Sequence, residues 1–212
     1  ILLVGNGGRE HARLDRLVLS PKVAEVIVCN NSYFDKPFLT IPEYSKIKTY
    51  TLAKLTCEAY VHLAVTHNVS MVVVGPETYL DDGIVDLCKS KNILCFGPTK
   101  AMSQIESSKS YAKTIMKQLG LPTANHSDVF TNYKDAHEFF ISNLISGYGI
   151  IKHDGLAAGK GVLVLKDTSS YSCDKGIHYL KNIYKKNPVT KIFFEEVLYG
   201  VEVSVLAFCN GK

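Results

Sequence analysis

Several patterns that would define other classes of protein are missing from this 212-residue sequence. It contains no C-x-x-C pair, and the two nearest of its six cysteines, Cys88 and Cys95, are too widely spaced for a zinc ribbon or a thioredoxin-type site. His62 and His67 are not spaced to place two metal ligands on one helical face. The net charge is only +4, so no nucleic-acid partner is expected. The densest basic cluster is typical of a solvated helix face and comprises Lys181, Lys185, Lys186 and Lys191.

No signal peptide, transmembrane stretch, internal repeat or low-complexity tract is recognisable either. The composition is that of an ordinary globular protein, with 46% hydrophobic and 21% charged residues. We therefore expect a cytoplasmic chain with reduced thiols and no membrane partner.

Both ends of the sequence indicate a fragment of a longer polypeptide. No Met precedes the apolar run Ile1–Val4, and Asn210-Gly211 follows the strand-like run Val203–Phe208. Asn-Gly favours a two-residue hairpin turn because both residues tolerate positive φ angles. Because the second strand of this hairpin is missing, we expect the natural chain to continue beyond Lys212.

Short β-rich runs alternate with helical stretches in the first half of the sequence. This alternation predicts an α/β fold with a Rossmann-like parallel sheet that helices cover on both faces. The predicted strands are residues 1–4, 23–29, 46–50, 71–74 and 94–96, and the predicted helices are residues 9–20, 52–67 and 83–91.

A longer helix, from Lys100 to Leu119, is predicted to separate this first unit from a second one. Gly120 and Pro122 end it in the way helices commonly stop. We therefore place an N-terminal domain at residues 1–99 and a connecting helix at 100–120. In the second unit we predict strands at 126–130, 149–152, 162–165, 191–195 and 202–208 and helices at 133–145 and 171–184.

The first glycine-rich loop, Gly5–His11 (GNGGREH), lies between a predicted strand and a predicted helix. The free N–H groups and positive dipole end of a helix N-terminus suit a phosphate. The dinucleotide fingerprint G-x-G-x-x-G is incomplete, because Glu10 stands at its third glycine. The second strand ends in Cys29-Asn30-Asn31, without the carboxylate that would hold a ribose. The loop therefore predicts a phosphate site of another kind.

The second glycine-rich loop, Asp154–Gly161 (DGLAAGKG), joins two predicted strands. A P-loop has four residues between its first Gly and its Gly-Lys pair and opens a helix, whereas Gly155 and Gly159 enclose three. Gly161, after Lys160, offers no hydroxyl group for magnesium. We interpret the loop as a flap that closes over nucleotide phosphates, with a plain mobile hairpin as the alternative.

Charged side chains lie near these loops. Glu77 ends the segment Val74–Glu77 at the carboxyl end of a strand, where α/β sheets bind ligands, so it is placed for a ligand hydroxyl or amine. Lys152 leads into the flap, and Lys152 and Lys113 could neutralise phosphate oxygens. Three acidic residues follow the apolar run before them: Glu195, Glu196 and Glu202. They suit recognition of adenine and ribose hydroxyls, and the alternative is that they are ordinary surface charges.

In this order, the motifs resemble those of the ATP-grasp superfamily and, within it, the glycinamide ribonucleotide synthetases. The two most specific phrases are GGREHA and DGLAAGKG. The matching stretches are Gly5–Ala12, Val74–Glu77, Phe96–Thr99, Ser107–Lys109 with Ala112-Lys113, Leu121–Ala124, Asp154–Gly161, and Glu195-Glu196 with Gly200 and Glu202.

The resemblance implies a substrate domain followed by part of an ATP-grasp domain, with the lid subdomain at residues 121–190 and the truncated second subdomain at 191–212. It implies that Gly7, Gly8 and Glu77 bind the sugar phosphate. The ATP-binding residues that it implies are Lys113 and Lys152 at the phosphates, Gly155, Gly159, Lys160 and Gly161 in the flap, Glu195, Glu196 and Leu198 at adenine, and Glu202 at the ribose.

The implied reaction joins glycine to phosphoribosylamine with ATP, through a glycyl acyl phosphate, in purine biosynthesis. Mg²⁺ or Mn²⁺ is implied as a cofactor, with ligands beyond residue 212, so we name no metal ligand and no certain catalytic residue here. We expect the fragment alone to be inactive.

Three departures and three alternatives accompany the resemblance. The loop after the second strand lacks the usual glycine, and Tyr199 and Val201 stand where acidic residues are common. The chain could instead be a non-catalytic nucleotide-binding module, or another ATP-grasp carboxylate–amine ligase, against which the two specific phrases argue. It could also belong to a multifunctional polypeptide with other purine-pathway activities.

Overall fold

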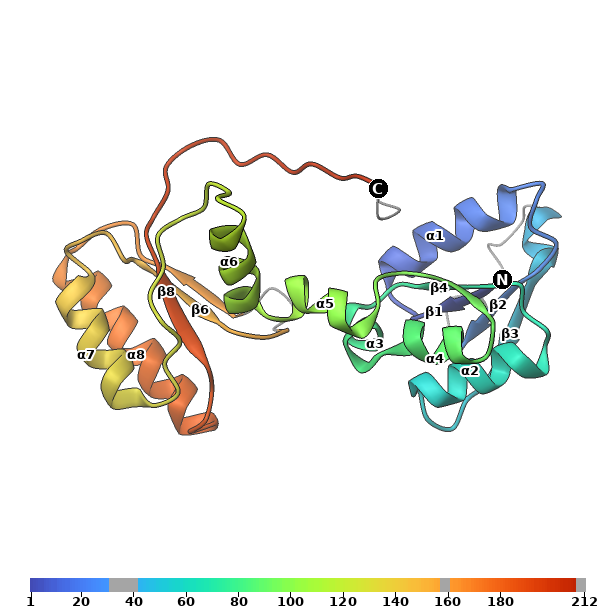
Figure 1. Ribbon diagram of the computed structural model, residues 1–212, viewed down its shortest axis with the longest axis horizontal. Helices are drawn as coiled ribbons and strands as arrows, with labels where there is room; N and C mark the ends of the chain where they lie inside the picture. The colour runs from blue at the N-terminus through green and yellow to red at the C-terminus, as the bar shows by residue number, and fades with distance from the viewer. Residues whose placement is uncertain (31–41, 157–160, 209–212) are drawn as a thin grey trace. The chain divides into compact units, whose positions relative to one another are not determined.

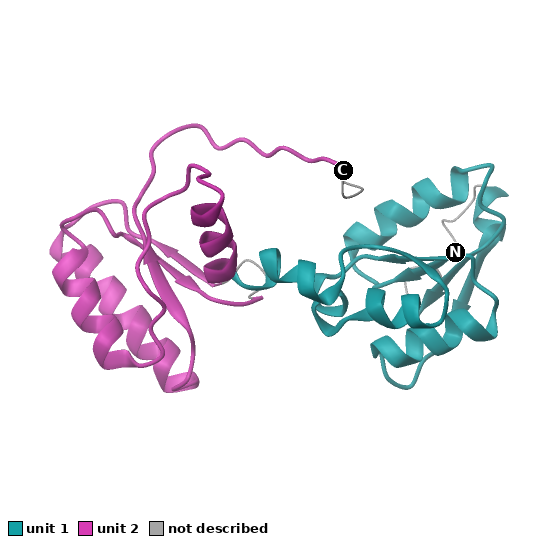
Figure 2. Cartoon of the chain, in the orientation of Figure 1, with its two compact units in different colours: residues 1–108 teal, residues 109–212 magenta. Residues whose placement is uncertain are grey.

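The computed structural model describes residues 1–30, 42–156 and 161–208, in two compact units. Unit 1 comprises residues 1–108 and unit 2 comprises residues 109–212 (Figure 2). Within the described ranges, no helix combines the length and the apolar character needed to span a membrane.

Unit 1 is built on a five-stranded parallel sheet with the strand order β3-β2-β1-β4-β5, which confirms the predicted Rossmann-like sheet (Figure 1). The central strand β1 pairs with β2 on one side and, in the register Leu2↔Val72 to Val4↔Val74, with β4 on the other. The strands are β1 (Leu2–Val4), β2 (Val26–Cys29), β3 (Ile47–Tyr50), β4 (Met71–Val74) and β5 (Leu94–Phe96).

Helices cover both faces of this sheet, as predicted. The helices of unit 1 are α1 (Gly8–Leu19), α2 (Cys57–Thr66), α3 (Glu77–Asp82), α4 (Ile84–Ser90) and α5 (Lys100–Ser107), of which α5 packs on α3 and α4; a 3₁₀ turn, η1 (Pro42–Lys46), precedes β3. The Thr56 hydroxyl caps α2 by accepting a hydrogen bond from the Ala59 N–H group, so this helix begins later than predicted.

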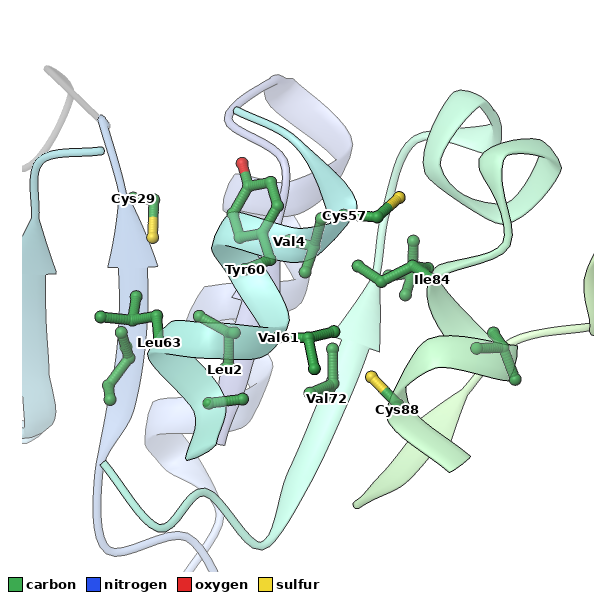
Figure 3. Close-up of a cluster of buried hydrophobic side chains, with 14 residues drawn as sticks. Leu2, Val4, Cys29, Cys57, Tyr60, Val61, Leu63, Val72, Ile84 and Cys88 are labelled. Carbon is green, nitrogen blue, oxygen red and sulfur yellow. The ribbon is translucent and has the colours of Figure 1, made fainter. Parts of the chain in front are cut away.

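Alternating residues of β1 supply two cores. Leu2 and Val4 pack into a cluster with side chains of α2 and α4, such as Tyr60 and Ile84 (Figure 3). Leu3 faces the other side, where it packs in a cluster with residues of α1. Burying a Leu or Val side chain contributes about 1.5–3 kcal/mol, so these two clusters fix the position of β1 in the middle of the sheet.

Unit 2 contains a three-stranded antiparallel sheet with the order β7-β6-β8. Its helices α7 and α8 pack on the sheet through a cluster that includes Phe140, Ile151, Leu180 and Phe194. The elements are α6 (Lys109–Gln118), α7 (Tyr133–Asn143), β6 (Ile150–His153), β7 (Val162–Val164), α8 (Ser170–Lys186) and β8 (Ile192–Glu195).

Several predictions about local structure were wrong. The single helix at 100–119 is two helices, because the backbone of Ser108 is extended (φ −127°, ψ 108°). Helix α3 was not predicted, since six residues are too few to show a helical period. The predicted strand 126–130 contributes only two isolated bridges to β8, at His126 and Phe130.

The predicted strand at residues 202–208 is also wrong. This segment is exposed and without regular structure, although its sequence is rich in β-formers. Neither of the two sheets in the described part of the chain includes this segment, and a strand is stable only as part of a ladder with a neighbouring strand. The Asn210-Gly211 turn lies outside the described residues. The domain limits at 99, 120 and 190 remain predictions.

Candidate functional site

In unit 1 the sheet reverses its winding between β1 and β4. From β1 the chain adds β2 and β3 on one side and β4 and β5 on the other. Open α/β sheets bind ligands outside the carboxyl ends of the strands at such a switch point. The loop after β1 comprises residues 5–7 and leads into α1 at Gly8, and the loop after β4 comprises residues 75–76 and leads into α3 at Glu77. The structure thus brings the predicted residues Gly7, Gly8 and Glu77 to one edge of the sheet.

Glu10 occupies the space between these two loops. Its side chain is 5% exposed, and its Oε2 atom accepts a hydrogen bond of 2.8 Å from the Gly7 N–H group. A Cβ atom on Gly75 would lie 2.5 Å from the carboxyl carbon of Glu10, and one on Gly7 would lie 2.9 Å from its Oε2 atom. The residue that breaks the dinucleotide fingerprint therefore contacts both loops and fills part of the space between them, which we call the switch-point crevice.

The start of α1 remains open at Gly8. Among the described residues, no heavy atom lies within 4 Å of a Cβ atom built there. Glu77 forms an ion pair with Arg9 (2.5 Å), and its pKa is lowered first by hydrogen bonding to its own backbone amide and then by Arg9. The site thus offers free N–H groups of a helix N-terminus, an exposed guanidinium group and an ionised carboxylate, a combination that suits a polar ligand with a phosphate.

In unit 2 the predicted residues Lys113, Lys152 and Glu195 form one cluster. The Nζ atom of Lys113, from α6, lies 3.0 Å from Oε1 of Glu195, at the end of β8. The Nζ atom of Lys152, from the neighbouring strand β6, lies 2.5 Å from Oε2 of the same carboxylate. Glu195 is only 3% exposed, so a buried carboxylate connects two ammonium groups that are distant in the sequence.

Lys113 has further partners in the segment after its helix. It donates hydrogen bonds to the Thr123 hydroxyl (2.5 Å) and to the Ala124 carbonyl (3.3 Å). Lys152 is less enclosed, with a side chain that is 25% exposed against 11% for Lys113. The cluster has one negative and two positive charges, and its net positive charge suits phosphate oxygens.

A cavity of about 550 Å³ adjoins Glu195. This volume lies within the range of small-molecule sites, which is about 300–1,000 Å³. Its walls combine apolar groups from the sheet with carboxylates, and they include four predicted ATP-binding residues. The lining residues are Ala124, Ile150, Glu195, Glu196, Leu198, Tyr199, Gly200, Val201 and Glu202.

Glu196 is held in this wall by Asn125. Its two carboxylate oxygens accept hydrogen bonds of 2.9 Å from the backbone N–H group and the side-chain amide of Asn125, which lower the pKa of Glu196. Tyr199 also lines the cavity, and its hydroxyl donates a hydrogen bond to the Lys166 carbonyl (3.0 Å).

The start of the flap is tied to α6. Asp154 accepts hydrogen bonds from the Ser110 N–H group (3.0 Å) and hydroxyl (2.6 Å), and Lys109 donates to the Gly155 carbonyl (2.8 Å). The far end returns to β6, where the His153 N–H group donates to the Gly161 carbonyl (2.8 Å). Gly159 and Lys160 lie outside the described residues.

Sequence reasoning missed four contributors to these sites: Glu10, Arg9, Asn125 and the Ser110–Asp154 pair. Ser110 and Arg9 lie within or next to the quoted motifs, so their positions were a usable signal. Asn125 directly follows the quoted stretch Leu121–Ala124, but its pairing with Glu196 could not be predicted, because it depends on a bridge between distant parts of the chain.

Two family models match the chain. Residues 1–106 match "Phosphoribosylglycinamide synthetase, N domain", and residues 107–212 match "Phosphoribosylglycinamide synthetase, ATP-grasp (A) domain". The chain is 36% identical over 212 residues to the trifunctional purine biosynthetic protein adenosine-3 of Drosophila melanogaster, covering all of this chain and 15% of that protein. It is 35% identical over 214 residues to the phosphoribosylamine–glycine ligase of Lactococcus lactis, covering all of this chain and 48% of that protein.

Solved structures share the fold. The phosphoribosylamine–glycine ligase of Thermotoga maritima matches with a TM-score of 0.63 at 23% identity, over 94% of this chain and 44% of that one. A biotin carboxylase of Campylobacter jejuni, solved as an ATP-analogue complex, matches with a TM-score of 0.67 at 19% identity, over 93% of this chain and 45% of that one.

The chain thus spans about half the length of its single-activity relatives and a smaller part of the trifunctional protein. Family models cover both of its halves, and the identity to ligases of the family extends over the whole sequence. This chain belongs to the phosphoribosylglycinamide synthetase family.

Proposed function

We propose that the full-length protein joins glycine to phosphoribosylamine with ATP, giving glycinamide ribonucleotide, ADP and phosphate in de novo purine biosynthesis. The observation that carries the proposal is the pair of lysines held at Glu195, beside a cavity of ligand size, in a chain of this family. The relatives named as phosphoribosylamine–glycine ligases support the choice of substrates.

For ATP, we assign the phosphates to Lys113 and Lys152, whose ammonium groups converge on one point. The flap glycines Gly155 and Gly161, with Gly159 and Lys160 between them, would close over the same phosphates. The adenosine would take the adjoining cavity, with backbone groups of Glu195 and Leu198 at adenine, Glu196 in the wall and Glu202 at the ribose.

The chemistry has two balanced steps. A carboxylate oxygen of glycine attacks the γ-phosphorus of ATP, the bond to the bridging oxygen breaks, and ADP leaves. The amine of phosphoribosylamine then attacks the acyl carbon of glycyl phosphate, phosphate leaves, and the nitrogen loses a proton. Positioning and charge neutralisation supply most of the catalysis in such phosphoryl transfers, which fits a site made of lysines and backbone groups.

For phosphoribosylamine, we assign the switch-point crevice of unit 1. The open space at Gly8 and the N-terminus of α1 would receive the phosphate, next to Gly7. Glu77, whose pKa is lowered by its own backbone amide and by Arg9, would accept hydrogen bonds from ribose hydroxyls.

Mg²⁺ or Mn²⁺ would neutralise the triphosphate during transfer. Among the described residues, no group of three or more His, Cys, Asp or Glu side chains could hold a metal ion. On the family resemblance, we propose that its ligands lie beyond residue 212, and we route no step through it.

We also propose a cytoplasmic protein and, on the example of the Drosophila relative, a possible fusion to other purine-pathway activities. The five cysteines that the structure describes are free thiols, as reducing compartments favour.

The first test is ADP release by the full-length protein that depends on both glycine and phosphoribosylamine. Lys152→Ala should abolish most turnover, whereas Lys175→Ala, an exposed lysine on α8, should not. ATP binding without glycine-dependent turnover would reject the substrate assignment and leave a nucleotide-binding module or another ATP-grasp ligase.

Gly8→Ala tests the sugar-phosphate site separately. The new methyl group would meet no atom of the described residues within 4 Å, so the fold should be unaffected, but it would stand where the phosphate approaches. We expect a KM for phosphoribosylamine at least tenfold higher and an unchanged KM for ATP. An unchanged KM for phosphoribosylamine would place its phosphate elsewhere.

A further inference from the structure

In unit 2, the Glu195 carboxylate lies between two ammonium groups, those of Lys113 and Lys152, which would otherwise repel each other. Lys113 and Lys152 both extend towards one point, and like charges repel strongly where water is largely excluded. Each lysine also loses roughly 2 kcal/mol of rotamer freedom when it is fixed. Without a counter-charge, the two long side chains would separate and turn to water.

Glu195 has the geometry of such a counter-charge. Its two oxygens face different lysines, at 3.0 Å for Lys113 and 2.5 Å for Lys152. Its backbone lies between two neighbours, with β6 on one side and the His126 bridge on the other, so the carboxylate starts from a rigid position. Because Glu195 is only 3% exposed, the surrounding residues restrict the movement of its carboxylate.

The two lysines depend on this carboxylate unequally. Lys113 keeps the Thr123 hydroxyl and the Ala124 carbonyl as partners if Glu195 is lost. For Lys152, Glu195 is the one polar partner that the structure gives within the described ranges. Loss of the carboxylate should therefore release Lys152 first.

We propose that the Glu195 side chain is a positioning residue, which holds Lys152 and Lys113 at the phosphate site before the nucleotide arrives. This inference rests on the proposed function, in which those lysines bind the ATP phosphates, and it gives the Glu195 carboxylate a role distinct from the backbone contact with adenine. The carboxylate itself does not contact phosphate, because two negative groups would repel. It acts through the ammonium groups.

The test is a double-mutant cycle for ATP affinity, measured by calorimetry on the full-length protein without glycine. Glu195→Gln keeps the size of the side chain and removes its charge, and we expect ATP to bind about tenfold more weakly. In a Lys152→Ala background, the same substitution should change the affinity less than about twofold, because the lysine that depends most on Glu195 is gone and Lys113 keeps its other partners. Glu138→Gln removes an exposed carboxylate of α7 and serves as the matched control.

The outcomes separate the two proposals. If the unsubstituted protein binds ATP and the losses from Glu195→Gln and Lys152→Ala simply multiply, Glu195 does not act through Lys152 and the positioning role is wrong. If the unsubstituted protein does not bind ATP, the proposed function fails and the positioning role fails with it. Should Glu195→Gln not fold, Glu195→Asp keeps the charge and shortens its reach, and the same non-additivity with Lys152→Ala is required of it.

Discussion

Replacement of Gly75 by alanine should destabilise unit 1 through a single neighbour, Glu10. The backbone at Gly75 is not in the left-handed region, so the substitution has no conformational penalty of its own. The new Cβ atom would lie 2.5 Å from the Glu10 carboxyl carbon, which is closer than real contacts allow. Glu10 would have to leave the crevice and give up its hydrogen bond from the Gly7 N–H group.

The expected loss follows from these two effects. A hydrogen bond to a charged group contributes about 1.5–3 kcal/mol, and inserting a methyl group into a packed site costs about 1–3 kcal/mol. The effects overlap, because a Glu10 side chain that swings out relieves the clash. We therefore expect the free energy of unfolding of unit 1 to fall by about 2–4 kcal/mol in urea titrations followed by circular dichroism.

The Glu10→Ala background provides the decisive comparison. With the carboxylate removed, Gly75→Ala should change the free energy of unfolding by less than about 0.5 kcal/mol. Gly8→Ala, with no atom within 4 Å of its new Cβ, should be equally mild in the unsubstituted protein. If Gly75→Ala costs as much without Glu10 as with it, the clash lies elsewhere and the reasoning about this crevice is refuted.

Three further measurements test other parts of the structure. Burial raises the pKa of Cys29 and of Cys57 to about 11, so only about one thousandth of each thiol is ionised at pH 8, and both should resist a disulfide reagent until urea unfolds the chain. Burial, together with the charge of Lys109, lowers the pKa of His153, so its NMR titration should have a midpoint below 6.5. The free energy of unfolding should then decrease as the pH falls from about 6.5 towards that midpoint, because the unfolded chain binds a proton first. His153→Gln should remove this decrease. Gly176→Ala in α8 would press a methyl group against the ring of Phe140, and thermal unfolding of unit 2 should occur at a lower temperature despite the better helix propensity of alanine.

The sheet of unit 1 could be predicted because its signals are local. Apolar runs such as Met71–Val74 are continuous, and glycines or polar residues bound them. The break in the helix at Ser108 was not predicted, because the serines around it were not interpreted as a helix end; the break coincides with the limit between the two compact units. Propensity also favoured a strand at 202–208, but a suitable sequence is not sufficient for a strand, which also needs a neighbouring strand, and neither sheet of the described residues includes this segment.

The candidate sites show the same limit. The family resemblance predicts ATP-binding roles for Lys113, Lys152 and Glu195, but nothing in their spacing indicates that one carboxylate lies between both lysines. Glu10 was noticed only as a departure from a fingerprint, and its packing against Gly75 depends on the pairing of β1 with β4. Contacts between distant residues require the tertiary structure.

The central position of β1 has a consequence for the order of folding during synthesis. Its first partner, β2, leaves the ribosome early, but its second partner, β4, follows only after β3 and α2. Until then one edge of an apolar strand stays open, and open edges are where nascent chains aggregate. The loops after β1 and β4 meet only when this last long-range pairing closes, so the crevice that holds Gly8 and Glu77 forms late, together with the core of its unit.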